Sequence, residues 1–422
     1  MREYLNKLPK EIQDLLYLAA DIASDNNMPA YLVGGFVRDL ILGVNNMDLD
    51  IIVEGDAIRF AHIFSRTLKA KAVTHKKFGT ATVTTTDNFK IDFARARKEY
   101  YPKPAHLPLV MPGTLRDDLS RRDFTINAMA ISISGSDFGR LIDLFNGISD
   151  LTNKKIRVLH SLSFIDDPTR ILRAIRFQKR YGFLIESNTL GLLKEAVNLK
   201  MLHKVHPHRL RDELILILKE RQAIKIIRAI DRLIGFSFIS ERLSLKEGTY
   251  RLLKSAETEI ERFKNMPDHH RHLDVWIIYL AVLIGSLPKD EIKSVSRRYA
   301  LRKIDEKRIL DYASINKKFI AKLSRRDIEA SEIFSLLKPL SCEVIVLIKA
   351  KHKNALLDKH IRDFLMTYSN THTYITGNDL RRLGLKPGPH YKKILNKILG
   401  AKLNGKVKTK EDELALAKKM MP

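Results

Sequence analysis

The chain has 422 residues, enough for two to four domains with cores of their own. Its 75 lysine and arginine residues against 49 aspartate and glutamate residues give a net charge of +26, which indicates a polyanionic partner such as nucleic acid. The sequence has no apolar run long enough to span a membrane and no signal-peptide core. Its single cysteine, Cys342, excludes an internal disulfide framework. We therefore expect a cytoplasmic protein without membrane contact.

Strand and helix patterns alternate through about the first 160 residues. The predicted helices span residues 5–28, 36–43 and 56–70. The predicted strands span residues 31–33, 48–53, two segments within 78–96, 127–133 and 154–159. The stretch 98–112 contains four prolines and little periodicity, so we expect a loop there.

Beyond about residue 160 the pattern is almost entirely helical. We therefore predict an α+β protein with a small mixed-sheet head, followed by an elongated all-helical neck, body and tail. The predicted domain boundaries are 1–160, 161–225, 226–325 and 326–422.

A stretch near the amino terminus combines a glycine turn, a helix with an arginine and two aspartates one residue apart. Gly34 and Gly35 let backbone N–H groups approach a phosphate at the positive end of a helix, and Arg38 follows one turn later. Asp48 and Asp50 share one face of an extended strand, where two carboxylates repel each other unless they share a cation. This combination predicts a site for a triphosphate and Mg²⁺, although an Asp-x-Asp alone is also typical of a solvated loop.

The sequence LSRRDFTINAMA supplies a second group of polar residues. Arg122 and Asp123 precede a predicted strand, and Asn127 lies just inside it. An arginine fork matches phosphate or ribose oxygens in two-point geometry, so we assign these residues to nucleotide binding. A buried Arg–Asp pair that holds the strand entrance is an equally good interpretation of this motif alone.

The sequence FIDDPTRILRAIRFQKRYGF predicts a helix with an acid at its start. Asp167 and the following proline are typical of an N-cap and a first helical turn. Arg170, Arg173 and Arg176 follow at spacings of three and form one basic stripe. Few acids lie in register to pair with them, which favours an anionic or base-bearing partner over a surface helix with its own salt bridges.

These three strings, in this order, resemble the nucleotidyltransferase family of class II CCA-adding enzymes and bacterial poly(A) polymerases over about residues 30–185. The tail string TGNDLRRLGLKPGP also resembles the C-terminal region of some members. The resemblance implies a nucleotidyltransferase head, a base-recognising neck and a basic, tRNA-binding tail. It implies that nucleotides are added, without a template, to the 3′ end of tRNA.

The resemblance also implies roles for single residues. Asp48 and Asp50 match the metal ligands, and Asp167 and Arg170 match the acid and arginine that read the base. The residues that match the family's triphosphate and sugar contacts are Gly35, Arg38, Arg122, Arg173 and Arg176. Family members often have Glu-Asp where this chain has Asp166-Asp167, a change that lies outside the base-reading pair.

The chemistry expected from this resemblance uses two Mg²⁺ ions, with ATP and CTP as substrates and pyrophosphate as product. Asp92, on a predicted strand, is a candidate third carboxylate near the metals, although an ordinary strand-end acid remains an alternative. Cytosine and adenine both present an amine beside a ring-nitrogen acceptor. The acid and arginine at 167 and 170 therefore suit both bases, whereas uracil and guanine would leave the carboxylate unpaired.

The last basic segment, residues 381–410, holds ten lysine and arginine residues and no acid. We predict a phosphate-binding surface there, and the residues assigned to tRNA are Arg381, Arg382, Lys386, Lys392 and Lys393. The histidine-rich stretch 268–274 is interpreted as a solvated loop rather than a metal site.

Several products remain open from the sequence. The enzyme could add CCA, only CC or only A, and a poly(A) polymerase acting on varied RNA ends is the nearest alternative. A catalytically inactive RNA-binding protein is the alternative from another class, and no protein partner is evident. The segment 98–112 lies where family members differ in these respects.

Overall fold

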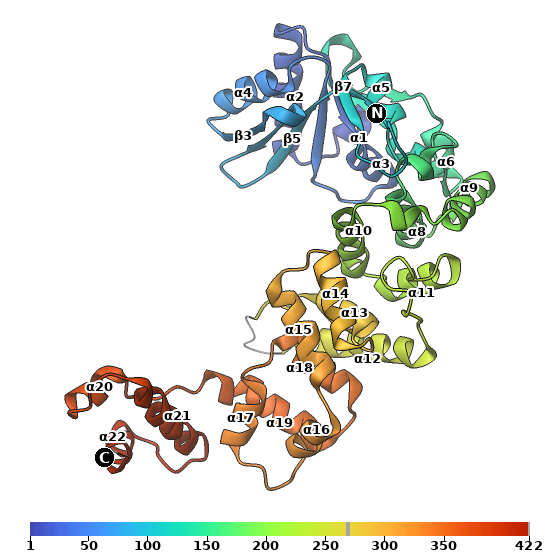
Figure 1. Ribbon diagram of the computed structural model, residues 1–422. Helices are drawn as coiled ribbons and strands as arrows, with labels where there is room; N and C mark the ends of the chain where they lie inside the picture. Colours follow the sequence, from blue (N-terminus) through green and yellow to red (C-terminus); the bar gives the residue numbers. More distant parts are fainter. Residues whose placement is uncertain (267–270, 421–422) are drawn as a thin grey trace. The chain divides into compact units, whose positions relative to one another are not determined.

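The computed structural model describes residues 1–266 and 271–420 (Figure 1). The chain divides into two compact units, Met1–Phe238 and Ile239–Pro422. None of the helices in the described residues has both the length and the apolar character needed to cross a membrane. The predicted boundaries at residues 160, 225 and 325 remain a proposal about smaller domains, and the predicted domain 226–325 includes the division at residue 238.

The first unit is built on a seven-stranded mixed sheet with the order β3-β4-β5-β2-β1-β8-β9. Its central pair, β2 and β5, is parallel, and the other pairs are antiparallel. The strands are β1 (Ala30–Val33), β2 (Leu49–Val53), β3 (Lys71–His75), β4 (Thr80–Thr84), β5 (Lys90–Arg95), β8 (Met129–Ser132) and β9 (Leu141–Asp143).

Amphipathic helices cover this sheet. Helix α4 packs on β3, β4 and β5 and brings Phe60 and Phe64 against Phe93, with ring centroids 5.5 and 5.1 Å away. The helices of this unit are α1 (Arg2–Leu5), α2 (Lys10–Asp25), α3 (Gly35–Leu42), α4 (Ala57–Thr67), α5 (Leu115–Ser120), α6 (Gly147–Thr152), α7 (Ser163–Asp166), α8 (Thr169–Tyr181), α9 (Ser187–Asn198), α10 (Pro207–Lys219) and α11 (Ala223–Leu233).

The structure confirms the predicted fold class, a mixed-sheet head followed by a mostly helical remainder, and corrects it locally. The predicted loop 98–112 contains an antiparallel hairpin of β6 (Arg97–Tyr100) and β7 (Leu109–Pro112). A short strand, β11 (Leu184–Ile185), lies within the region predicted to be helical and pairs in parallel with β10 (Lys155–Ile156). Asn127 lies in a 3-10 turn before β8, not inside the strand, because Phe124 accepts from its backbone N–H.

The second unit is helical throughout its described residues. Helix α13 packs against α12, α15 and α18 (Figure 1), and all of its residues after Val275 are buried. The helices are α12 (Glu247–Lys264), α13 (Val275–Ile284), α14 (Lys289–Arg298), α15 (Lys303–Ser314), α16 (Lys317–Leu323), α17 (Ala330–Leu337), α18 (Cys342–Lys351), α19 (Ala355–Met366), α20 (Gly377–Arg382), α21 (Pro389–Leu403) and α22 (Lys410–Lys419). Part of the histidine-rich stretch, residues 268–270, lies outside the described residues.

Candidate active site

Three carboxylates lie on one face of the sheet at its parallel central pair. Asp50 on β2 is opposite Asp92 on β5 in the strand register, and Asp48 precedes Asp50 on the same face, separated from it by the buried Leu49. The side chains of all three aspartates are exposed on this face, whereas the alternate residues pack into the core. Thr82 on β4 donates to Asp92 over 2.5 Å.

This arrangement changes the acidity of the central carboxyl group. Desolvation by its neighbours and the negative charges of Asp92 and Asp48 raise the pKa of Asp50 to about 6, against the opposing effect of Arg122. A cation would relieve the repulsion among these carboxylates, so the donor set fits a hard metal ion. Among the described residues no group of three or more potential ligands converges on one point. An ion held by Asp48 and Asp50 would therefore complete its shell with phosphate oxygens and water, as Mg²⁺ commonly does.

The glycine turn lies beside two of the predicted arginines. Gly34 is the N-cap of α3 with φ of +70°, and a Cβ atom there would lie 2.6 Å from Nη1 of Arg122. Arg38 is only 5% exposed, and its guanidinium donates to both oxygens of Asp39 over 2.8 and 2.9 Å and to Oδ1 of Asn127 over 2.5 Å. Arg38 is thus fixed in place by its neighbours before any ligand binds.

The residues of the second motif are held by partners that the sequence did not pair. Arg122 donates to Oδ2 of Asp118 over 2.9 Å, so the Arg122–Asp123 pair of the alternative interpretation does not form. Asp123 instead accepts from Asn127 and, over 2.6 Å, from Arg173 of α8. Burial alone would raise the pKa of Asp123, but Arg173 and Asn127 outweigh it and lower this pKa to about 2.

The third motif corrects the expectation that acids are lacking around its arginines. Acids from other elements pair with them: Arg173 donates to Asp123 and Glu213, and Arg176 forms ion pairs with Glu213 at 3.2 Å and with Glu220 at 3.7 Å. The reasoning from register failed because these acids are distant in sequence; Asp123 and Glu213, for example, lie 50 and 40 residues away from Arg173. The stripe is therefore a partly neutralised set of arginines with fixed positions.

The two residues assigned to base reading are also held in place. Asp167 accepts from the backbone N–H and the hydroxyl of Thr169 at Oδ1, and its Oδ2 forms an ion pair with Arg209. Arg170 is 4% exposed and donates to Oγ of Ser163 and to the backbone carbonyl of Arg121, both over 2.7 Å.

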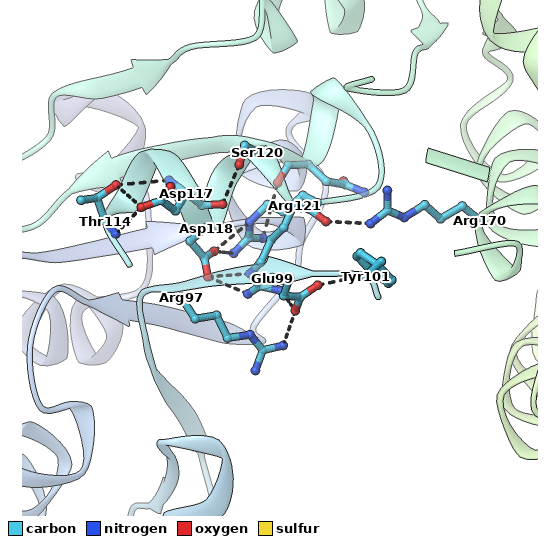
Figure 2. Close-up of polar contacts among 11 residues, drawn as sticks. Arg97, Glu99, Tyr101, Thr114, Asp117, Asp118, Ser120, Arg121 and Arg170 are labelled. Carbon is cyan, nitrogen blue, oxygen red and sulfur yellow. Dashed lines mark hydrogen bonds and ion pairs between the residues drawn. The ribbon is translucent and has the colours of Figure 1, made fainter. Parts of the chain in front are cut away.

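A group of residues that the sequence did not single out supports Arg121 and thereby Arg170. Glu99 of β6 accepts from Arg97 and Arg121 at 3.0 and 2.9 Å and from the hydroxyl of Tyr101 at 3.1 Å (Figure 2). Asp118 accepts from the other side of the Arg121 guanidinium over 2.6 Å. The only sequence signal for this group was the doubled arginine before Asp123. Glu99 and Asp118 belong to separate elements, β6 and α5, so no continuous motif contains them.

One open cavity of about 880 Å³ joins these groups. Its lining includes twelve of the thirteen predicted catalytic and nucleotide-binding residues, which are Gly34, Gly35, Arg38, Asp48, Asp50, Arg122, Asp123, Asn127, Asp167, Arg170, Arg173 and Arg176. Asp92 does not line the cavity; it lies next to Asp50, on the neighbouring strand. Arg209 and Glu213 of α10 also line the cavity, and the sequence reasoning missed both.

The predicted tRNA-binding residues lie in the second unit, on and between α20 and α21. All five side chains, Arg381, Arg382, Lys386, Lys392 and Lys393, are exposed. Beneath them, Leu380, Ile394 and Ile398 pack in a small core with residues of α22. The basic segment is therefore folded, and its assignment to tRNA stays a prediction.

Comparisons with known proteins agree with these observations. A family model described as the poly A polymerase head domain matches residues 30–157. An A-adding tRNA nucleotidyltransferase of Geobacter sulfurreducens is 37% identical over 97% of this chain. The chain spans only 47% of that relative's length. An A-adding tRNA nucleotidyltransferase of Halalkalibacterium halodurans is 32% identical over 96% of this chain and 91% of its own length.

Solved structures match over nearly the whole chain. The Thermotoga maritima CCA-adding enzyme complexed with tRNA is 34% identical, with a TM-score of 0.74 over 99% of this chain and 98% of that chain. A CCA-adding enzyme in complex with ATP is 35% identical, with a TM-score of 0.78 over 97% of this chain and 95% of that chain. The relative from Halalkalibacterium halodurans is 32% identical and is covered over 91% of its length, and the solved structures agree with it. The chain therefore belongs to the tRNA nucleotidyltransferase family.

Proposed function

We propose that this protein adds C residues, A residues or both to the 3′ end of tRNA, without a template and with release of pyrophosphate. The observation that carries the proposal is one cavity lined by the glycine turn, by the two aspartates Asp48 and Asp50 and by the pair Asp167 and Arg170. Relatives named as A-adding enzymes favour A among the possible products. We also propose that the protein acts in the cytoplasm.

The chain's own residues divide the work of this reaction. Asp48 and Asp50 would hold two Mg²⁺ ions, which when bound activate the 3′-hydroxyl and neutralise the departing pyrophosphate. The N–H groups around Gly34 and Gly35, at the start of α3, would bind the triphosphate together with Arg122. Arg38, Asp123, Asn127, Arg173 and Arg176 would keep this surface rigid through the hydrogen bonds and ion pairs that fix their side chains.

The remaining two groups select the base. The carboxylate of Asp167 accepts from the exocyclic amine of cytosine or adenine, and Arg170 donates to the adjacent ring nitrogen. Uracil and guanine place a carbonyl oxygen opposite the carboxylate and leave buried polar groups unpaired, so both are rejected.

The test uses tRNAs that lack the last one, two or three nucleotides, incubated with Mg²⁺ and each labelled nucleoside triphosphate. The added length distinguishes complete, CC-only and A-only addition from poly(A) synthesis. We expect Asp50→Ala to abolish addition and to retain the affinity for tRNA, because the substituted residue lies at the reacting centre. Turnover by Asp50→Ala comparable to that of the wild type would refute the metal assignment. If the wild-type protein binds tRNA but incorporates nothing, the inactive RNA-binding alternative is correct.

A further inference from the structure

Arg209 of α10 lies beside the acid assigned to base reading. Its Nη2 forms an ion pair with Oδ2 of Asp167 at 2.7 Å, and both residues line the cavity. The two side chains are 25% and 15% exposed. Arg209 is outside the three motifs, and the proposed function gives it no task.

The hydrogen bonds of Asp167 leave one place for a ligand. A carboxylate has about four acceptor positions, two on each oxygen. Both positions of Oδ1 are used by Thr169, through its backbone N–H at 3.1 Å and its hydroxyl at 2.6 Å. The Arg209 guanidinium lies on one side of Oδ2, in the ion pair. An amine that enters the cavity therefore bonds to Oδ2, directly beside the guanidinium of Arg209.

That guanidinium has an unused donor. Nη1 of Arg209 is buried and has no hydrogen-bond partner within the described residues. An unpaired buried donor is unfavourable. A ligand acceptor that lies beside Oδ2 and accepts from Nη1 would therefore contribute more binding free energy than an ordinary hydrogen bond. Arg170 is on α8, which begins two residues after Asp167, whereas Arg209 comes from α10.

Only one of the two candidate bases has acceptors on both sides of its amine. In adenine the amine is flanked by the ring nitrogens N1 and N7, whereas in cytosine it is flanked by one ring nitrogen and a C–H group. Extending the proposed function, we propose that Arg209 is a third base-reading residue that donates to N7 of adenine while Arg170 donates to N1. The site then favours ATP over CTP.

The decisive probe is 7-deaza-ATP, in which a C–H group replaces N7. We expect the wild-type protein to have a kcat/KM for 7-deaza-ATP about tenfold below that for ATP, the loss of one charge-assisted hydrogen bond. In Arg209→Met the two values should agree within about twofold, and CTP should be affected less than ATP. Arg211→Met is the matched control, because Arg211 is on the same helix, is also 25% exposed and pairs with an acid, Asp212, but does not line the cavity.

The outcomes separate this inference from the proposed function. Equal use of ATP and 7-deaza-ATP by the wild-type protein would overturn the N7 contact while leaving nucleotide addition intact, and this measurement requires no variant. Discrimination that persists in Arg209→Met would overturn the assignment to Arg209. Absence of any incorporation by the wild-type protein would overturn the proposed function itself.

Discussion

Single residues at the site are constrained by their backbone as well as by their chemistry, and Gly34 is the clearest case. Its φ of +70° combines with ψ of −132°, and an added Cβ would meet the Arg122 guanidinium at 2.6 Å. We expect Gly34→Ala to lower stability by about 1–3 kcal/mol and to lose most nucleotide binding, because Arg122 is displaced. Calorimetric melting and titration with a nonhydrolysable triphosphate measure the two effects.

A second glycine of the same helix provides the control. Gly43 ends α3 with φ of +68°, and nothing lies within 4 Å of an added Cβ. Gly43→Ala should therefore cost about 1 kcal/mol and leave nucleotide binding unchanged. Equal loss of nucleotide binding in both variants would show that the close approach to Arg122 has no role in binding.

Asp123 links charge at the site to the pH dependence of stability. Its folded-state pKa of about 2 lies below the ordinary value of 3.8, so its stabilisation is present above about pH 4 and disappears as the pH falls towards 2. We expect Asp123→Asn to lower the free energy of unfolding by about 2 kcal/mol at pH 7. Urea unfolding of both proteins at decreasing pH should show this difference shrinking between pH 4 and pH 2. A difference that stays constant over that range would contradict the ion pair with Arg173 as its cause.

At the scale of elements, the β6–β7 hairpin is attached to the site by one buried acid. Glu99 is 6% exposed and joins Arg97, Arg121 and Tyr101, and burial next to this carboxylate raises the pKa of the Tyr101 phenol. We expect Glu99→Gln to lower the free energy of unfolding by about 1–3 kcal/mol and to speed amide exchange in β6 and β7, because two arginines lose their countercharge.

The control for this variant is an exposed ion pair of the same unit. Asp137 pairs with Arg140, with 57% and 68% of the side chains exposed, so Asp137→Asn should change stability by less than about 1 kcal/mol. Amide exchange that accelerates equally throughout the first unit in Glu99→Gln, instead of in the hairpin, would contradict the attachment through Glu99.

The same elements show what the sequence could predict. Helix α3 and strand β2 have strong local signals: the helix has a glycine start and a left-handed Gly43 end, and the strand is apolar and buried except for Asp50. The predicted bounds of both lie within about one residue of those observed. In β7 all four residues are exposed, so buried and exposed residues do not alternate, and the sequence pattern therefore predicts a loop. Strand β3 was missed because its burial alternates only between intermediate and exposed.

Side chains show the same limit. Spacing predicted which residues gather at the cavity, since each motif is a continuous string. It did not predict that Arg173 would meet Asp123 and Glu213, or that Arg209 would meet Asp167. Glu213 and Arg209 come from α10, which packs on α8, and Asp123 comes from the segment before β8. Pairings between distant elements depend on tertiary structure, which local patterns do not encode.

For the whole molecule, the net charge of +26 should govern the affinity for RNA. We propose that the five exposed residues of the basic tail contribute specifically. Their replacement by Gln should reduce the slope of log affinity for tRNA against log salt by up to about 4, since each lost phosphate contact removes about 0.7–0.9. The variant residues are Arg381, Arg382, Lys386, Lys392 and Lys393. Filter binding at several salt concentrations measures the slope.

A matched variant separates a local contribution from bulk charge. Five exposed lysines of the first unit, when changed to Gln, remove the same five positive charges; they are Lys69, Lys71, Lys76, Lys77 and Lys90. If the tail residues contact phosphates, their loss should reduce the salt slope clearly more than the loss of the control lysines. Since the tail has a small core of its own and only exposed side chains are changed, circular dichroism should be unaltered. Equal slopes for the two variants would mean that net charge, and not the tail, sets the affinity for tRNA.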